Sequence, residues 1–238
     1  MATLVGAPQE LDTNPPYLFE DYAITIKRSP SRRLVQLPRD WFHDIPGPVF
    51  GTERVRTTDN DLTIQHAGPP IGQRLVLSGC VLDSDGRPAP GILLEIWQAN
   101  AAGRYTEPAD PGFMPLDPNF TGAGRCITDS EGRYRFTTIK PAAYAGPIGT
   151  MFRPAHIHFS LFGRTLSERL ITQCYFDGDP LIDRDPIVQA VRDPKARKLL
   201  VARFDTGSTP FHSGGPESAL CYTWDLVLRG PGATPMER

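Results

Sequence analysis

The stretch RLVLSGCVLDSDGRPAPGILLEIW, residues 74–97, decides the fold class. Its first part, Arg74–Leu82, has leucine at alternate positions, the period of a strand with one buried face. Its last part, Ile92–Trp97, is a second apolar run. Between them Asp83–Gly86 predicts a turn, in which Gly86 can adopt a positive φ. The stretch therefore predicts two strands joined by a turn and a loop.

The same pattern of short strands and turns continues along the chain. Asp129–Gly132 predicts another turn, and Tyr134, Phe136 and Thr138 follow it on one face of a strand. Strands without intervening helices favour an all-β fold with a β-sandwich core, long loops and little helix. The remaining expected strands are Ala155–Phe162, Leu170–Phe176 and Tyr222–Leu228.

Two further features complete the expected organisation. Residues 1–70 are irregular and carry scattered aromatic residues, which predicts an N-terminal arm that packs on the core or on a partner chain. Residues 71–238 are then the β-sandwich domain that carries the chemistry. Near its end one helix is expected, capped by Asp193, with Pro194 at its first position, and continued by Lys195–Val201.

Composition excludes several classes of protein. The chain has 25 Lys and Arg against 27 Asp and Glu, a net charge of −2, so there is no bulk attraction to nucleic acid or an anionic membrane. It has no apolar run of about 20 residues and no signal-peptide pattern. The four cysteines form no Cys-x-x-Cys pair, and Cys80 and Cys174 lie in apolar runs that favour buried, reduced thiols. These features predict a cytoplasmic protein.

The first candidate for chemistry is His156-Ile157-His158. Residues two apart in a strand point to the same face, so both imidazoles can converge on one metal ion. The alternative is a pair of hydrogen-bonded core histidines. The spacing does not choose the metal, because imidazole binds zinc, copper, iron and nickel.

Tyrosines are the candidate oxygen donors. Three of the seven, Tyr134, Tyr175 and Tyr222, lie in expected strands, where core packing is the ordinary role. In contrast, Tyr105 lies just past a strand end and Tyr144 lies in a Pro-, Gly- and Ala-rich loop. Loops at strand ends commonly carry functional groups. Spacing alone leaves open whether either tyrosine binds a metal.

Taken together, the motifs resemble those of the intradiol ring-cleavage dioxygenases. The resemblance runs from about Tyr22 to Gly230. It rests on five strings in this order: Trp97-Gln98-Ala99-Asn100, Gly103-Arg104-Tyr105, Asp117-Pro118-Asn119-Phe120, Arg153-Pro154-Ala155-His156-Ile157-His158 and Ile171-Thr172-Gln173.

The resemblance implies a non-haem Fe(III) ion held by two tyrosinates and two histidines. The matching positions are Tyr105, Tyr144, His156 and His158. Phenolate is a hard anionic donor that suits a hard, highly charged ion, and the cation favours loss of the phenol proton. Tyr144 matches the ligand that gives way to the catechol and accepts a proton from it, which makes it a catalytic residue.

Four other positions match substrate-site residues of the family. Arg153 would place a fixed cation beside developing negative charge, and Gln173 would be a polar group next to it. Trp97 and Tyr22 match positions of the substrate pocket. Read without the resemblance, Arg153 is a solvent-facing or ion-paired arginine and Trp97 packs in the core.

The longer strings resemble members that work in two-chain complexes. They imply cleavage of protocatechuate with O₂ to 3-carboxy-cis,cis-muconate, and a homologous alpha chain as the partner. Three alternatives remain open: a dioxygenase for another substituted catechol such as 4-sulfocatechol, a non-catalytic β-sandwich subunit, and a copper protein.

One departure from the pattern adjoins Tyr144. Related chains usually read Gly-Pro-Tyr-Pro-Trp there, whereas this chain reads Ala142-Ala143-Tyr144-Ala145-Gly146. The loss of the indole predicts either an altered substrate preference or refilling of the space by Met151 or Phe152.

Overall fold

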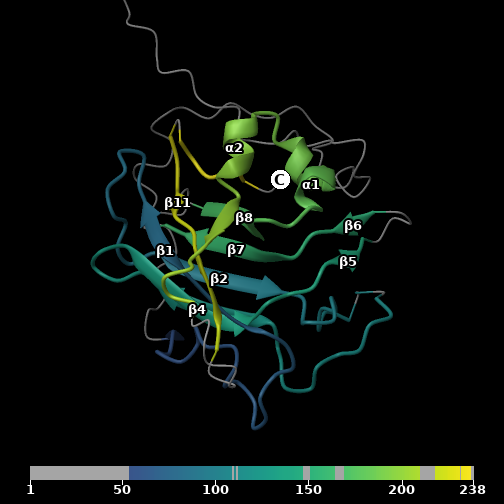
Figure 1. Ribbon diagram of the computed structural model, residues 1–238. Helices are drawn as coiled ribbons and strands as arrows, with labels where there is room; N and C mark the ends of the chain where they lie inside the picture. The colour runs from purple at the N-terminus through teal and green to yellow at the C-terminus, as the bar shows by residue number, and fades with distance from the viewer. Residues whose placement is uncertain are drawn as a thin grey trace, which may run out of the picture.

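The computed structural model describes residues 54–108, 110, 112–146, 151–163, 169–209, 218–230 and 232–236, which form an all-β fold with two short α-helices (Figure 1). The strands are β1 (Arg74–Leu82), β2 (Leu93–Gln98), β3 (Ala123–Ile127), β4 (Arg133–Ile139), β5 (Tyr144–Ala145), β6 (Phe152–Arg153), β7 (His156–Phe162), β8 (Arg169–Phe176), β9 (Val201–Phe204), β10 (Leu220–Thr223) and β11 (Leu226–Val227). The helices are α1 (Pro186–Ala190) and α2 (Pro194–Lys198), preceded by a 3-10 turn at Ile182–Arg184.

The strands form one nine-stranded sheet and a separate hairpin, β5–β6. The main sheet runs in the order β11-β1-β10-β9-β8-β7-β2-β3, with β4 paired to β1. Its two halves pack against each other, since Phe136 of β4 meets Phe159 of β7 with ring centroids 6.0 Å apart. β9 joins the halves by pairing with both β10 and β8. The expected sandwich is confirmed as two facing layers of a nearly closed sheet.

The alternation in the sequence explains which faces are buried. Tyr134, Phe136 and Thr138 are all less than 5% exposed, as expected for one inward face. The two glycine turns are also confirmed, because Gly86 and Gly132 have φ values of 75° and 69°. Positive φ carries little steric cost only for glycine.

Three details of the expected elements were wrong. The expected helix from Pro194 does begin after an Asp193 cap, but it ends at Lys198 because Val201 starts β9 and pairs with β8. The single strand expected at 222–228 is divided into β10 and β11. Between them the Asp225 carboxylate accepts a hydrogen bond from the backbone N–H of Cys80 at 2.8 Å and interrupts the ladder. Cys80 is half-buried, because it lies on the outer face of β1, whereas Cys174 is fully buried.

The described end of the expected arm, residues 54–70, packs on its own sheet. Leu62 is fully buried and donates its N–H to the carbonyl of Thr137 on β4. Asp59 accepts a hydrogen bond from Arg125 of β3 at 2.9 Å. Residues 1–53, including Tyr22, lie outside the described residues, so contact of the arm with a partner stays a prediction.

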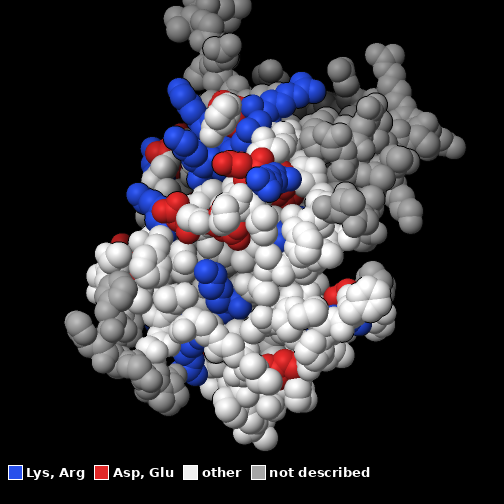
Figure 2. All heavy atoms as spheres, turned by 45° about the vertical axis from the view of Figure 1, so that its right-hand side comes forward, with Lys and Arg blue, Asp and Glu red and all other residues white. Residues whose placement is uncertain are grey.

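Charged side chains of both signs gather over the two helices at the top of the view in Figure 2, and the strands below them carry few charges. The helix α2 itself carries three basic residues, Lys195, Arg197 and Lys198. None of the helices among the described residues is long and apolar enough to cross a membrane.

Candidate active site

The two histidines stand on the outer face of β7. Ile157 between them is fully buried in the core, so alternation turns His156 and His158 outward together. Their rings are 4.9 Å apart, centroid to centroid. The expectation that the two imidazoles share a face is therefore met.

Tyr105 lies in a tight loop after β2. The side chain of Asn100 accepts hydrogen bonds from the N–H groups of Ala102 and Arg104, which closes the loop. Gly103 has a φ of 81°, and a Cβ there would lie 3.0 Å from both the Ala143 carbonyl oxygen and the Tyr144 Cβ. A glycine at this position thus allows the Tyr105 loop to pack directly against the Tyr144 segment.

Tyr144 lies in the short hairpin. It pairs with Arg153 across the β5–β6 ladder, so the hairpin carries both residues to the start of β7. Tyr105 and Tyr144 pack edge to face with ring centroids 5.5 Å apart. Tyr105, Tyr144 and His158 are half-buried, whereas His156 is 1% exposed.

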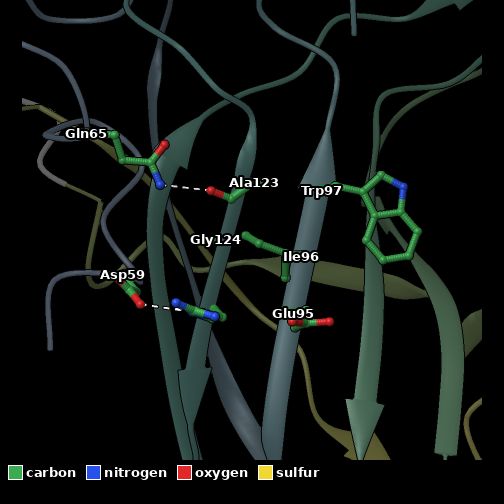
Figure 3. A pocket seen from close by; sticks show the side chains of 8 residues that line it. Asp59, Gln65, Glu95, Ile96, Trp97, Ala123 and Gly124 are labelled. Atoms are coloured by element: carbon green, nitrogen blue, oxygen red, sulfur yellow. Dashed lines mark hydrogen bonds and ion pairs between the residues drawn. The ribbon is translucent and has the colours of Figure 1, made fainter. Parts of the chain in front are cut away.

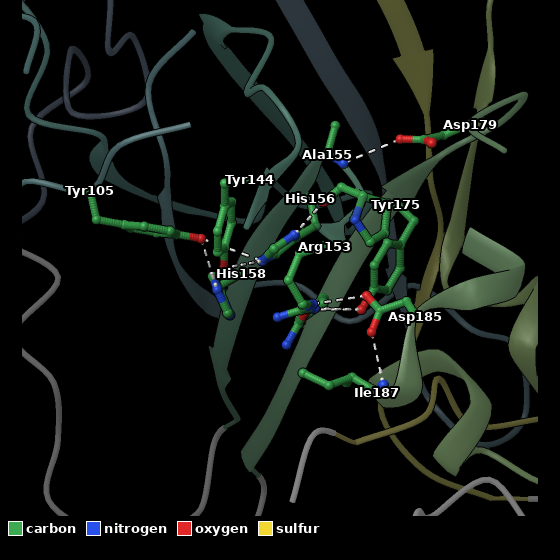
Figure 4. Close-up of polar contacts among 12 residues, drawn as sticks. Tyr105, Tyr144, Arg153, Ala155, His156, His158, Tyr175, Asp179, Asp185 and Ile187 are labelled. Carbon is green, nitrogen blue, oxygen red and sulfur yellow. Dashed lines mark hydrogen bonds and ion pairs between the residues drawn. The ribbon is translucent and has the colours of Figure 1, made fainter. Parts of the chain in front are cut away.

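The four side chains converge with their donor atoms facing one another (Figure 4). The Tyr105 hydroxyl oxygen lies 3.2 Å from His158 Nε2 and 3.4 Å from His156 Nε2. The Tyr144 hydroxyl oxygen lies 3.4 Å from His156 Nε2. Donors bound about 2.1 Å from one transition-metal ion have separations of this size. The chemistry of the set, two phenols and two imidazoles, suits a hard trivalent ion better than a soft one.

His156 is held as a neutral imidazole. Its Nδ1 lies 2.7 Å from the Pro154 carbonyl oxygen, which can only accept, so Nδ1 carries the proton and Nε2 presents a lone pair to the cluster. Burial, reinforced by the charge of Arg153, holds the pKa of His156 well below its ordinary value. Elsewhere in the described parts of the chain, no three His, Cys, Asp or Glu side chains gather in a way that could hold a metal.

Arg153 lies beside the cluster and is only 3% exposed. Its Nε donates to the Asp185 carboxylate at 2.9 Å, and its Nη2 donates to Gln173 Oε1 and to the Tyr175 hydroxyl. Burial opposes the charged form, but Tyr175 and Asp185 outweigh it, so the pKa of Arg153 is raised. Of the two readings without the resemblance, the structure supports an ion-paired arginine over a solvent-facing one.

The amide of Gln173 has a fixed orientation. Its Oε1 accepts from Arg153 and from the Tyr175 hydroxyl, the latter at 2.8 Å. Its Nε2 is buried and has no hydrogen-bond partner among the described residues. Gln173 can therefore donate to a bound molecule while it holds Arg153.

Trp97 does not pack in the core. It is half-buried on the outer face of β2, and its indole stacks on His158 with centroids 4.9 Å apart and planes 2° from parallel. On its other side lies a groove of about 440 Å³ bordered by Asp59, Gln65, Glu95 and Arg125 (Figure 3). Trp97 thus separates this groove on β2 and β3 from the donor cluster on β7.

Reasoning from the sequence missed two members of the site, Asp185 and Tyr175. Tyr175 could have been found, because it is two residues from Gln173 and shares its face of β8. Asp185 gave a weaker signal: Asp185-Pro186 repeats the cap pattern of Asp193-Pro194 and marks the start of α1. Nothing local showed that its carboxylate reaches Arg153, 32 residues away in sequence.

Beside Tyr144, Met151 occupies the space next to Gly146. A Cβ on Gly146 would lie 2.8 Å from Met151 Cε. The N–H of Gly146 donates to the Met151 carbonyl at 2.7 Å, which extends the hairpin ladder by one bond. Phe152 is 60% exposed, so of the two residues considered for refilling the space, Met151 is the one that lies against Gly146.

A family model described as Dioxygenase matches residues 45–230 of the chain. The chain therefore belongs to the intradiol ring-cleavage dioxygenases, a family of oxidoreductases. It is 48% identical over 234 residues to the protocatechuate 3,4-dioxygenase beta chain of Burkholderia cepacia, with 97% of each chain covered. It is 28% identical to the protocatechuate 3,4-dioxygenase alpha chain of Pseudomonas putida, over 75% of this chain and 83% of that one.

Among solved structures, the dioxygenase domain of a dioxygenase carbohydrate-binding protein fusion from Streptomyces sp. SirexAA-E is similar. The TM-score is 0.51 at 26% identity, with 78% of this chain and 99% of that chain covered.

Proposed function

We propose that this chain is the iron-bearing subunit of an intradiol dioxygenase that cleaves protocatechuate with O₂ to 3-carboxy-cis,cis-muconate. The observation that carries the proposal is the convergence of two tyrosine hydroxyls and two histidine nitrogens at 3.2 to 3.4 Å. Similarity over nearly the whole length to the Burkholderia cepacia beta chain supports the choice of substrate.

In this proposal Tyr105, Tyr144, His156 and His158 hold one non-haem Fe(III) ion. When bound, the ion supplies a Lewis acid that favours ionised catechol hydroxyls and draws electron density from the ring. The chain's own residues bind and orient the substrate: Arg153 fixes a cation beside the cluster, and the Gln173 amide supplies a donor. We assign to Tyr144, half-buried in the hairpin of two-residue strands, the role of accepting a substrate proton.

The expected partner is a homologous alpha chain in a heteromeric complex. Its support is the similarity of this chain to both a beta chain and an alpha chain of protocatechuate 3,4-dioxygenase. Tyr22 and the rest of the arm would complete the substrate pocket together with that partner. A cytoplasmic location is also part of the proposal, in keeping with four cysteines that are all free.

A second candidate substrate is 4-sulfocatechol, favoured by the replacement of a bulky side chain by Gly146 in this chain. Met151 counts against it because its methyl group stands in the space beside Gly146. Protocatechuate is therefore the substrate that the site supports best.

The test is turnover of protocatechuate, 4-sulfocatechol and plain catechol by the purified two-chain complex, with the products identified by NMR. We expect protocatechuate to be preferred and to be cleaved between its two hydroxylated carbons. A yellow hydroxymuconic semialdehyde as the main product would contradict the ferric, tyrosine-rich site, since extradiol enzymes use Fe(II) with two histidines and one carboxylate. A complex without turnover of any of the three would support a non-catalytic subunit.

A further inference from the structure

Arg153 is held by a buried carboxylate that comes from outside the strands of the site. Asp185 lies just before α1, is 0% exposed, and accepts from Arg153 Nε at 2.9 Å. It lies 32 residues from Arg153 in the sequence. The contact therefore depends on how α1 packs against β8.

The same carboxylate has two partners. Its Oδ2 accepts a hydrogen bond from the guanidinium of Arg153. Its Oδ1 accepts one from the backbone N–H of Ile187 at 2.8 Å, which caps α1. The helix is fixed in turn by Val188 and Val191, which pack around the fully buried ring of Tyr175. Because one carboxylate makes both contacts, the position of Arg153 Nε is tied to the start of a packed helix.

On the opposite edge, the guanidinium is held by β8. Nη2 donates to Gln173 Oε1 and to the Tyr175 hydroxyl at 3.1 Å. A guanidinium is planar and carries five N–H donors in a fixed fork, so contacts at Nε and Nη2 set both its plane and its rotation. Nη1 then has a defined direction. In Figure 4 Arg153 lies between Asp185 and the tyrosine–histidine cluster.

We infer that Asp185 is a positioning residue for the reaction: its carboxylate orients Arg153 toward the substrate and does not itself touch substrate or metal. The inference rests on the proposed function, in which Arg153 stabilises developing negative charge. A cation that stabilises a transition state must be held in place before the reaction, because reorganising it afterwards costs rate. Asp185 supplies that constraint by its charge and by its attachment to α1.

The chain contains a matched control. Asp193 precedes α2 as Asp185 precedes α1: each is followed by proline, and each accepts from the N–H two residues on at 2.8 Å. Asp193 has no contact with Arg153 among the hydrogen bonds of the described residues. Asp185→Asn and Asp193→Asn both preserve a helix cap, since asparagine caps as well as aspartate. They differ in burial, since Asp185 is fully buried and Asp193 is half-buried, and in whether the lost charge faces Arg153.

The experiment uses the full two-chain complex. For Asp185→Asn we expect kcat for protocatechuate to fall at least about tenfold with KM changed far less, the pattern of an interaction made in the transition state. The visible tyrosinate absorption should stay at its native wavelength. Asp193→Asn should keep kcat within about twofold. Equal kcat losses in the two variants, with the native complex active, would overturn the inference and leave the proposed function intact; an inactive native complex would refute the proposed function itself.

A double-mutant cycle distinguishes an effect of Asp185 through Arg153 from a purely structural effect. In an Arg153→Gln background, Asp185→Asn should cause no further fall in kcat, because Asp185 acts through Arg153. The same substitution should raise the unfolding temperature of that background, since it removes a buried carboxylate that has lost its cation. Independent, multiplicative losses of kcat would show that Asp185 does not act through Arg153.

Discussion

Replacing Gly146 by tryptophan tests whether Met151 has taken the place of a larger side chain beside Tyr144. A Cβ at this position would lie 2.8 Å from Met151 Cε and 3.4 Å from the Met151 carbonyl oxygen. The φ of Gly146 is not positive, so the backbone accepts an L-residue. The obstacle to an indole is therefore the end of a flexible side chain.

The magnitude follows from overpacking. Forcing extra atoms into an occupied site costs about 1–3 kcal/mol. For a chain of this size each kcal/mol lowers the unfolding temperature by about 2–4 °C, so Gly146→Trp should lower it by about 2–12 °C. The double variant Gly146→Trp/Met151→Ala removes the obstructing methyl group and should recover at least half of that loss.

The assay combines thermal unfolding of the two-chain complex with kcat/KM for protocatechuate, 4-sulfocatechol and catechol. Met151→Ala opens space beside Tyr144 and should shift the ratio toward the bulkier sulfonate, and adding Gly146→Trp should reverse the shift. If Gly146→Trp leaves both the unfolding temperature and all three ratios at native values, Met151 does not fill this space and residue 146 has no bearing on substrate choice.

Two further predictions concern the metal and the partner. Replacing Tyr105 by Phe removes one phenolate donor, so the visible absorption band should shift and kcat should fall at least about a hundredfold; a colourless, zinc-loaded native protein with normal activity would contradict the assigned ligands. Co-expression with the homologous alpha chain should raise solubility and activity together, and a stable, fully active chain on its own would show that no partner is needed.

The strands that the sequence predicted best are those with one buried face. In β1, β4 and β7, alternation reports which side chains enter the core, because each strand is paired in the sheet and has a packed inner face. β9 was missed: it has four residues and is defined by pairing with β8 and β10, which its own sequence cannot report. The β5–β6 hairpin was missed for the same reason.

The candidate site was likewise only partly predictable from the sequence. The facing of His156 and His158 follows from strand geometry alone and was predictable without any relative. The positions of Tyr105 and Tyr144 depend on two loops that meet at Gly103, so they were reached only through the family resemblance. Asp185 was missed by both routes, because its role is visible only once α1 is packed against β8.

Two neighbouring residues of the site, Tyr144 and Arg153, are buried to different extents. Tyr144 and Arg153 face each other across a two-residue ladder, yet they are held differently. Arg153 is buried and tied to β8 and α1, whereas Tyr144 is half-buried. In the proposed function the side chain of Tyr144 changes position while the guanidinium stays in place. The proposed function therefore requires an anchor for Arg153 that does not depend on Tyr144, and the contact with Asp185 is such an anchor.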